Sequence, residues 1–372
     1  MKPTFGSAPH IPHGDDAASP DPRAQAAGPP TPKLAHLLPT FDEVWERTHI
    51  VALPMRVRFR GITTREAALI QGPRGWGEFA PFVEYATEEA ASWLASALEA
   101  AWLGFPTPAR PYIEVNATIP AVPAQQVPEL LSRYPGCTTI KVKVAEKGHT
   151  LADDRARVAA VRRARPEAKV RVDANQGWSV AQAAEAAAAL GELEYLEQPC
   201  AGVDNLVALR AELDRRGIPM PIAADESIRR ARDPYRVAES GAAAFAVLKV
   251  APLGGVRRLG RIAAHLSECG METVVASALD TAVGLNAGLW AAAEVSQRAA
   301  GLATQSLFRE DVAAPRPLVD GTLATAPVFP EPDRLAALAA PRERTEWWRE
   351  RLAACLDWLH NAAEKQNNAP TQ

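Results

Sequence analysis

Five charged residues recur at nearly regular intervals along the central part of this chain, each at the end of a short apolar run. They are Lys143, Asp173, Glu197, Asp225 and Lys249, and the intervals between them are 30, 24, 28 and 24 residues. One strand, one crossover helix and two loops need about that length, and such units in series build a closed parallel barrel. The sequence therefore predicts an α/β fold with a (β/α)8-type barrel.

These five residues are expected to share one site, because the carboxyl ends of barrel strands converge on one mouth. The alternative is that they are ordinary charges on exposed strands. That reading conflicts with a parallel barrel, whose strands are buried on both faces, where an unpaired charge is costly. With residues 112–117 as the first strand, Lys143 ends the second and Lys249 ends the sixth, so the two lysines would face each other across the carboxylates.

Length and composition set the class of protein. With 372 residues and 47% hydrophobic composition, the chain can bury a core large enough for a barrel and an appended domain. A formal net charge of −3 gives no reason to expect a nucleic-acid or anionic membrane partner, and the apolar stretches are too short to span a bilayer. The four cysteines are far apart without a CxxC pair, which argues against a zinc site and a disulfide framework. We therefore expect a soluble cytoplasmic protein.

The chain is predicted to divide into five segments. Residues 1–33 contain no apolar run of signal-peptide length and are expected to form a disordered tail. The other four are an α+β capping domain over 41–108, the catalytic barrel over 112–308, a segment over 309–364 that packs back on the barrel or cap, and a frayed tail over 365–372. Within the cap, the pattern predicts a hairpin that turns at residues 72–75 and a helix over 88–103.

Three of the five charges are carboxylates with no Cys or His nearby. Such an all-oxygen set suits Mg²⁺, or alternatively Mn²⁺, better than Zn²⁺. The predicted ligands are Asp173, Glu197 and Asp225, and Asp225 is preferred over Glu226 because it shares the inward phase with Ala223. A metal at this place stabilises the negative charge that develops when a proton leaves the carbon beside a carboxylate. The candidate substrate is therefore a small-molecule carboxylate.

The lysines are candidate bases. A free lysine, with a pKa of about 10.4, is a poor base, but burial, a neighbouring cation or a metal lowers that value. Lys141 either supplies such a cation to Lys143 or holds a substrate carboxylate. Asn175 either positions a ligand or water or caps a helix. Ser277 either donates a hydrogen bond to a second substrate carboxylate or belongs to an ordinary turn.

Two glycines, Gly254 and Gly255, follow the sixth predicted strand after a short apolar segment. Their backbone N–H groups either face an anion or simply belong to the loop that leads into the next helix. As an anion-binding motif this pair is weak.

In combined order and spacing these residues resemble the enolase superfamily, whose members remove a proton α to a carboxylate with bases on a barrel and a bound Mg²⁺. The resemblance covers roughly residues 59–285. Its motifs are Lys141-Val-Lys143, Asp173-Ala-Asn175, Glu197-Gln-Pro-Cys200, Asp225-Glu-Ser227 and Leu248-Lys-Val-Ala-Pro-Leu-Gly-Gly255. It implies a modified TIM barrel of the (β/α)7β form with an N-terminal α+β capping domain. Gln198 and Gln176 depart from the common pattern, in which Glu-Glu-Pro is frequent where this chain has Glu-Gln-Pro.

Within the superfamily, the chain most resembles the actinobacterial o-succinylbenzoate synthase family of the menaquinone pathway. The supporting segments are Phe59-Arg-Gly-Ile-Thr-Thr-Arg65, Gly75-Trp-Gly-Glu-Phe-Ala-Pro81, Val115-Asn-Ala-Thr118 and Cys200. This resemblance implies a syn dehydration of 2-succinyl-6-hydroxy-2,4-cyclohexadiene-1-carboxylate to 2-succinylbenzoate. Lys143 would remove the α-proton and then protonate the departing hydroxyl, and Lys249 would stabilise negative charge from the opposite side.

Three alternatives are weighed against this function. Lysines on both faces also suit an N-succinylamino acid racemase or a dipeptide epimerase. A non-catalytic binding barrel would normally lack one of the five charged residues, and all five are present. A sugar-acid dehydratase of this superfamily usually has a catalytic His after the seventh strand, where this chain has Ser277 and Asp280. The sequence does not indicate the oligomeric state.

Overall fold

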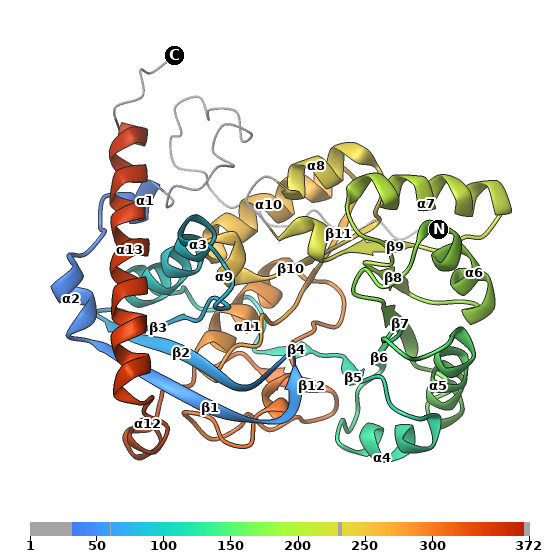
Figure 1. Ribbon diagram of the computed structural model, residues 1–372, viewed down its shortest axis with the longest axis horizontal. Helices are drawn as coiled ribbons and strands as arrows, with labels where there is room; N and C mark the ends of the chain where they lie inside the picture. The colour runs from blue at the N-terminus through green and yellow to red at the C-terminus, as the bar shows by residue number, and fades with distance from the viewer. Residues whose placement is uncertain (1–31, 60, 230–232, 368–372) are drawn as a thin grey trace, which may run out of the picture.

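The computed structural model of the protein describes residues 32–59, 61–229 and 233–367. Residues 1–31 of the predicted tail and residues 368–372 lie outside the described residues. The centre of the molecule is a curved sheet of seven parallel strands, in the order β11-β10-β9-β8-β7-β6-β5 (Figure 1). The strands are β5 (Ala117–Ile119), β6 (Thr139–Lys143), β7 (Lys169–Asp173), β8 (Tyr195–Glu197), β9 (Ile222–Ala224), β10 (Phe245–Leu248) and β11 (Glu272–Val275).

Helices alternate with these strands and cover the outside of the sheet (Figure 1). The longer ones are α4 (Val127–Ser132), α5 (Leu151–Ala164), α6 (Val180–Leu190), α7 (Val203–Arg216), α8 (Asp233–Ser240), α10 (Val256–Glu268) and α11 (Gly284–Val295). Short turns lie between them at Ala124–Gln126, Glu226–Ile228, α9 (Val250–Leu253) and Gln305–Leu307. The predicted fold class, a barrel of alternating strands and helices with an N-terminal cap, is confirmed.

Local sequence signals explain where the helices begin and end. Thr150 and Ser179 each form a capping box with the residue three positions later, which satisfies free N–H groups at the start of α5 and α6. Helix α7 ends at Gly217, whose left-handed backbone (φ 66°) closes the last turn.

The first barrel strand differs from the prediction over residues 112–117. Strand β4 (Tyr112–Glu114) instead pairs antiparallel with β12 (Thr322–Ala324), and β5 supplies the barrel strand. The chain changes partner at residues 115–116, because the Val115 N–H donates to Gly321 O and the Asn116 N–H to Ala300 O. Isolated parallel bridges from residues 300–301 to Val115 and Ala276 then close the ring in the position of an eighth strand.

The N-terminal unit is a three-stranded antiparallel sheet with a helix against it (Figure 1). Its elements are α1 (Pro32–Ala35), α2 (Phe41–Trp45), β1 (Thr48–Phe59), β2 (Ile62–Gly72), β3 (Gly75–Phe79) and α3 (Thr87–Leu98). The predicted hairpin turn at residues 72–75 is present. The predicted helix over 88–103 is present too, but its last turn, Glu99–Leu103, is π-helical.

The C-terminal segment lies against this cap and ends in two helices, α12 (Pro332–Ala337) and α13 (Arg342–Asn367). Figure 1 shows α13 running beside the cap sheet and α3. Trp348 on α13 packs edge-on against Phe79, with ring centroids 5.6 Å apart, and its indole N–H donates to Glu66 at 2.9 Å. The apolar stripe of this helix is therefore buried on the cap of its own chain.

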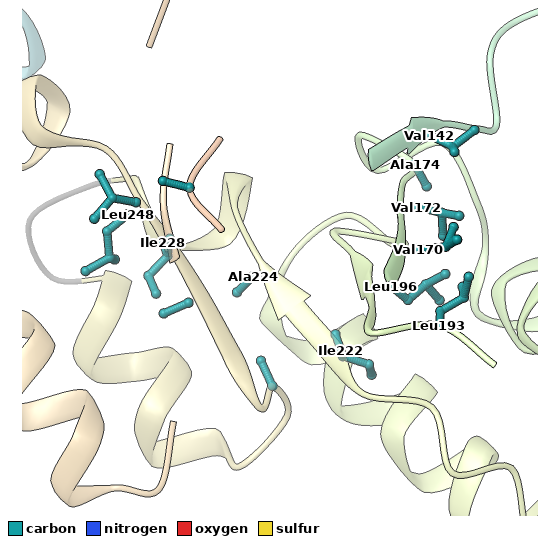
Figure 2. Packing of buried hydrophobic residues seen from close by; sticks show 14 of the residues in the cluster. Val142, Val170, Val172, Ala174, Leu193, Leu196, Ile222, Ala224, Ile228 and Leu248 are labelled. Atoms are coloured by element: carbon teal, nitrogen blue, oxygen red, sulfur yellow. The ribbon is translucent and has the colours of Figure 1, made fainter. Parts of the chain in front are cut away.

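Two large apolar clusters support the two parts of the molecule. One fills the space between the barrel strands and their outer helices and includes Val142, Val172, Leu196 and Ile222 (Figure 2). The other joins the cap to α13. No helix within the described residues is long and apolar enough to cross a membrane. Because strand residues alternate between faces, the outward valines leave their polar neighbours pointing into the barrel.

Candidate active site

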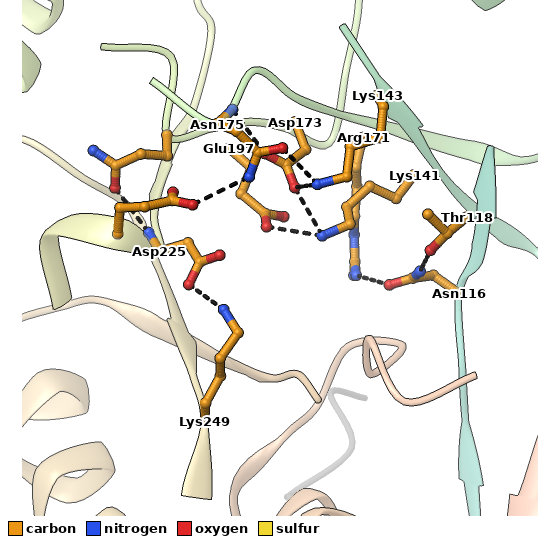
Figure 3. A network of polar contacts seen from close by, with 12 residues as sticks. Asn116, Thr118, Lys141, Lys143, Arg171, Asp173, Asn175, Glu197, Asp225 and Lys249 are labelled. Carbon is orange, nitrogen blue, oxygen red and sulfur yellow. Dashed lines mark hydrogen bonds and ion pairs between the residues drawn. The ribbon is translucent and has the colours of Figure 1, made fainter. Parts of the chain in front are cut away.

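The five regularly spaced charges lie together at the carboxyl ends of the barrel strands (Figure 3). Lys143, Asp173 and Glu197 are the last residues of β6, β7 and β8, while Asp225 and Lys249 directly follow β9 and β10. The strand register pairs Lys143 with Asp173 and Asp173 with Glu197, so these side chains are neighbours across the sheet. Parallel strands in register are the reason that residues far apart in sequence converge here.

Ion pairs connect the lysines to the carboxylates. Lys141 Nζ lies 3.1 Å from Asp173 Oδ2 and 2.8 Å from Glu197 Oε1. Lys143 Nζ lies 2.6 Å from Asp173 Oδ2 and also donates to Asn175 Oδ1 at 2.6 Å. On the other side, Lys249 forms a close ion pair with Asp225. The two catalytic candidates thus approach the acidic cluster from β6 and from the end of β10.

Burial makes the charges of this cluster depend on one another. Burial by itself would raise the pKa of Asp173 and Asp225, but the adjacent lysines outweigh it and hold both pKa values well below the usual range. Burial and the nearby Asp173 raise the pKa of Glu197 to about 7. Burial and Arg229 lower the pKa of Lys249, against the opposing effect of Asp225. Glu197 is therefore the carboxylate with the least compensation.

For Lys141, burial opposes the charged form, but Glu197 and Asp173 outweigh it and raise its pKa well above the ordinary value. Lys141 therefore stays charged, which agrees with the prediction that it supplies a cation beside Lys143. Its ammonium is engaged by the chain's own carboxylates at the distances given above.

The structure adds two residues to this site, Arg229 and Glu226, to which the sequence analysis gave no role of their own. Arg229 Nη2 lies 3.2 Å from Asp225 Oδ2 and 2.8 Å from Glu226 Oε1. Glu226, considered earlier only as a rival ligand, also accepts a hydrogen bond from Asn175 Nδ2 at 3.1 Å. The spacing of four residues between Asp225 and Arg229, on one helical turn, is the sequence signal that would have indicated this pair.

Asn175 and Ser277, the two polar candidates with alternative roles, have different surroundings. Asn175 does not cap helix α6, because the N-cap of that helix is Ser179. Its amide joins Lys143 to Glu226, which places it within the site. The Ser277 hydroxyl accepts hydrogen bonds from the backbone of the turn after β11 and from Thr304 at 3.0 Å, so it is engaged by that turn.

The two glycines at residues 254–255, a weak anion-binding motif, lie beside a carboxylate of the chain itself. Glu99 of the cap accepts a hydrogen bond from the Val256 N–H at 2.7 Å, at the start of α10. A Cβ on Gly255 would lie 2.0 Å from Glu99 Oε2, so only glycine permits this approach. The carboxylate at a helix N-terminus is electrostatically favourable and joins cap to barrel.

A second cap carboxylate makes a similar contact with the next barrel helix. Glu78 on β3 accepts hydrogen bonds from the N–H groups of Thr281 at 2.9 Å and Gly284 at 3.2 Å, and from the Thr281 hydroxyl. Gly284 is the first residue of α11. The contacts of Glu78 and Glu99 with the barrel helices form the cap–barrel seam.

The acidic cluster has the donor chemistry of a metal site. Glu197 Oε2 is buried and has no hydrogen-bond partner, although a buried carboxylate oxygen normally has one. Within the described part of the chain, no three carboxylate, imidazole or thiol groups converge on one point. Asp225 is paired with Lys249 and Arg229. The donors are hard oxygens with one of them unpaired. They therefore suit Mg²⁺ or Mn²⁺ chemically, and an ion would compete with the lysines for them.

The chain is similar to two known protein families. Residues 50–101 match the family described as Enolase N-terminal domain-like, and residues 124–330, more than half of the chain, match Enolase C-terminal domain-like. The chain belongs to the enolase superfamily. Magnesium is the metal that enzymes of this superfamily generally use, which agrees with the all-oxygen donor set above.

Relatives with high identity extend over most of this enolase-superfamily chain. An o-succinylbenzoate synthase from Mycolicibacterium smegmatis is 59% identical over 323 residues, covering 86% of this chain and 98% of the relative. Another from Mycobacterium tuberculosis is 56% identical over 328 residues, covering 87% and 98%. Among solved structures, a muconate lactonizing enzyme from Pseudomonas putida has a TM-score of 0.65 at 22% identity, covering 79% of this chain and 98% of that one. The last likeness concerns the fold alone.

Proposed function

We propose that this protein is an o-succinylbenzoate synthase that uses Mg²⁺, or alternatively Mn²⁺. The reaction is the syn dehydration of 2-succinyl-6-hydroxy-2,4-cyclohexadiene-1-carboxylate to 2-succinylbenzoate in menaquinone biosynthesis. The observation that carries the proposal is identity of 56–59% with o-succinylbenzoate synthases over nearly their whole length. The lysines and carboxylates at the barrel mouth support it, because the reaction begins by removing a proton beside a carboxylate.

Lys143 carries the proton transfers in this proposal. Its neutral amine takes the proton from the ring carbon that bears the carboxylate, and the electron pair moves toward that carboxylate. The resulting ammonium then gives the same proton to the C6 hydroxyl, the C–O bond breaks and water leaves. One base acting on one face suffices for a syn elimination, and formation of the aromatic ring makes the step favourable.

Lys249 acts electrostatically from the opposite side of the substrate. Its ammonium, paired with Asp225 in the structure, stabilises the negative charge that develops after proton removal. Asp173, Glu197 and Asp225 would hold the metal ion. When bound, Mg²⁺ supplies positive charge beside the substrate carboxylate and so makes the α-proton more acidic.

Three further residues are proposed to bind substrate or hold the base. Lys141 keeps a positive charge at the barrel mouth, where it is proposed to bind a carboxylate of the substrate. Asn175 accepts a hydrogen bond from Lys143 and fixes the direction of its amine. Ser277, in the turn after β11, is proposed to donate its hydroxyl proton to the succinyl carboxylate.

The proposed function also implies a division into domains and a cellular compartment. We propose a capping domain over residues 41–108 whose segment 75–81 covers the mouth, a catalytic barrel over 112–308 and a C-terminal segment over 309–364. The protein acts on a small molecule, and the cytoplasm is its proposed compartment. All four cysteines are free, which suits a reducing environment.

The test is a spectroscopic assay of purified protein with the cyclohexadiene carboxylate, first with Mg²⁺ and then with excess EDTA. Metal-dependent formation of the aromatic product, with kcat/KM of at least about 10⁴ M⁻¹s⁻¹, is the expected result. Absence of product at saturating Mg²⁺ would contradict the proposal.

A second candidate, N-succinylamino acid racemase or dipeptide epimerase, is favoured by one observation. Lys143 and Lys249 approach the acidic cluster from different sides, as exchange of a proton between two faces requires (Figure 3). Deuterium exchange at the α-carbon of N-succinylamino acids measures this activity. Exchange faster than dehydration would make it the main function.

A further inference from the structure

Gln198 directly follows Glu197, and its side-chain amide forms hydrogen bonds within the site. It is fully buried, with 0% exposure. Its Oε1 accepts hydrogen bonds from the N–H groups of Asp225 and Ser227, both at 3.0 Å. Its Nε2 donates to Ser227 Oγ at 2.7 Å and to the Cys200 carbonyl at 2.8 Å. All four hydrogen-bonding positions of the amide are therefore occupied.

The main chain of Gln198 makes two further connections. Its N–H donates to Ala223 O, on β9, at 2.8 Å, and its carbonyl accepts a hydrogen bond from the Gln176 N–H at 2.8 Å. Gln176 lies in the loop after β7. One residue therefore joins the loops that follow β7, β8 and β9, and these are the three strands whose ends carry the proposed metal ligands.

The backbone here is held in an uncommon conformation. Gln198 has a φ of 34°, and its partner Gln176 has a φ of 69°. Non-glycine residues seldom adopt positive φ, and they keep it only when surrounding contacts enforce it. The hydrogen bonds described above are such contacts, so the loop geometry depends on them.

The chemistry of an amide suits this place better than other side chains of its size. A hydrocarbon would leave the Asp225 and Ser227 N–H groups buried without acceptors, which is costly. A carboxylate keeps those two acceptor contacts but offers no donor to the Cys200 carbonyl. The contact with the Asp225 N–H is decisive, because it fixes the backbone from which that carboxylate extends.

We propose that Gln198 is a positioning residue that fixes Asp225 relative to Glu197 and so sets the geometry of the metal site. The inference rests on the proposed function only in taking Asp225 and Glu197 as metal ligands. It also gives a physical reason for Glu-Gln-Pro in this chain: the glutamine is a scaffold for the neighbouring strand and not a ligand itself.

The experiment compares Mg²⁺ and Mn²⁺ affinity of the full-length protein and its variants by calorimetry, without substrate. Gln198→Met, which removes the acceptor, is expected to raise the metal Kd tenfold or more. Gln198→Glu retains both acceptor contacts to the Asp225 and Ser227 N–H groups and is expected to stay within threefold of the wild-type Kd. Saturating metal is expected to restore most of kcat in Gln198→Met, because the ligands themselves are intact.

The control is Leu209→Ala, which removes a buried side chain of α7 that packs on the outside of the barrel. It is expected to lower Tm while leaving the metal Kd within twofold. Should Gln198→Met fail to fold, Gln198→Ala removes the same acceptor without added bulk. A wild-type Kd in a folded variant lacking the acceptor overturns the proposal, as does a tenfold loss in Gln198→Glu.

Failure of the proposed function is distinguishable from failure of this inference. Wild-type protein that binds Mg²⁺ without dehydrating the cyclohexadiene carboxylate contradicts the synthase proposal, and the comparison of metal affinities still decides the role of Gln198. Wild-type protein with no measurable affinity for either metal overturns the inference directly.

Discussion

Two buried glutamates, one at the barrel mouth and one at the cap–barrel seam, have the same raised pKa of about 7 in different surroundings. In both, burial is the largest cause and a neighbouring aspartate adds to it, Asp173 beside Glu197 and Asp280 beside Glu78. Glu197 has one oxygen paired with Lys141 and the other without a partner. Glu78 instead accepts hydrogen bonds from the backbone and a hydroxyl of residues 281–284.

The difference teaches what a perturbed pKa does and does not indicate. A raised pKa reports burial and nearby charge, which occur in structural contacts as well as in active sites. The unpartnered oxygen of Glu197 is open to a cation, whereas the Glu78 oxygen that contacts the barrel already accepts hydrogen bonds from Thr281 and Gly284. The unpartnered oxygen supports the mouth as the proposed site of chemistry, whereas the seam contacts join the cap to the barrel.

The largest expected effect at the mouth is that of Lys143→Ala. Loss of the amine removes the proposed base and acid together, so kcat for dehydration is expected to fall by about 10³-fold. Metal affinity, measured by calorimetry, is expected to remain, because the carboxylates are retained. Lys147→Ala, in the exposed loop after β6, is the control. Full activity in Lys143→Ala would remove Lys143 from the mechanism.

Asp225→Asn is expected to weaken metal binding by about tenfold or more, because a neutral amide is a poorer ligand for a hard cation. The measurement is the Kd for Mg²⁺ by calorimetry. Asp214→Asn, a surface change on α7, is the matched control with the same chemical alteration. An unchanged Kd in Asp225→Asn would mean that the ion is held elsewhere, with Glu226 as the first residue to test.

At the seam, the expected effects are on stability. Gly255→Ala places a Cβ 2.0 Å from Glu99 Oε2 at a backbone φ of +116°, which is expected to lower the free energy of unfolding by about 1–3 kcal/mol. Gly260→Ala on the same helix, α10, meets nothing within 4 Å and is expected to leave stability unchanged or slightly raised. Urea unfolding compares the two. Equal stability of these variants would show that the Glu99 contact contributes little.

Mouth and seam also differ in how far the sequence predicts them. The positions of Lys143, Asp173 and Glu197 follow from strand length and regular spacing, which depend on local sequence and on a repeated topology. The inward phase predicted for Asp225 agrees with its contact to Lys249. These are properties that a periodic pattern can carry.

The remaining contacts depend on geometry that no periodic pattern encodes. Gln198 acts through a left-handed backbone conformation and a loop from another strand. The seam contacts of Glu78 and Glu99 require glycines at the starts of two barrel helices to lie against the cap, and two of the hydrogen bonds there join residues 157 and 206 positions apart in the chain. The strand predicted over residues 112–117 was wrong in its bounds because the change of partner is set by residues 300 and 321.

The smallest expected effect separates the two glutamates by pH. Glu78 has a folded pKa of about 7, above the value of about 4.3 in an unfolded chain. The folded state therefore binds the proton more tightly, and this contribution to stability is full below about pH 4 and is lost as pH rises through 7. Glu78→Gln removes it, so between pH 6 and pH 8 the variant should lose about 1–2 kcal/mol less stability than wild type. The measurement is urea unfolding at both pH values, once with EDTA and once with saturating Mg²⁺. Because the hydrogen bonds of Glu78 are with Thr281 and Gly284 and not with the proposed metal ligands, the difference between variant and wild type should be the same in both conditions. Parallel pH profiles would show that Glu78 is not the titrating group, and a difference that disappears with Mg²⁺ would assign it to the mouth.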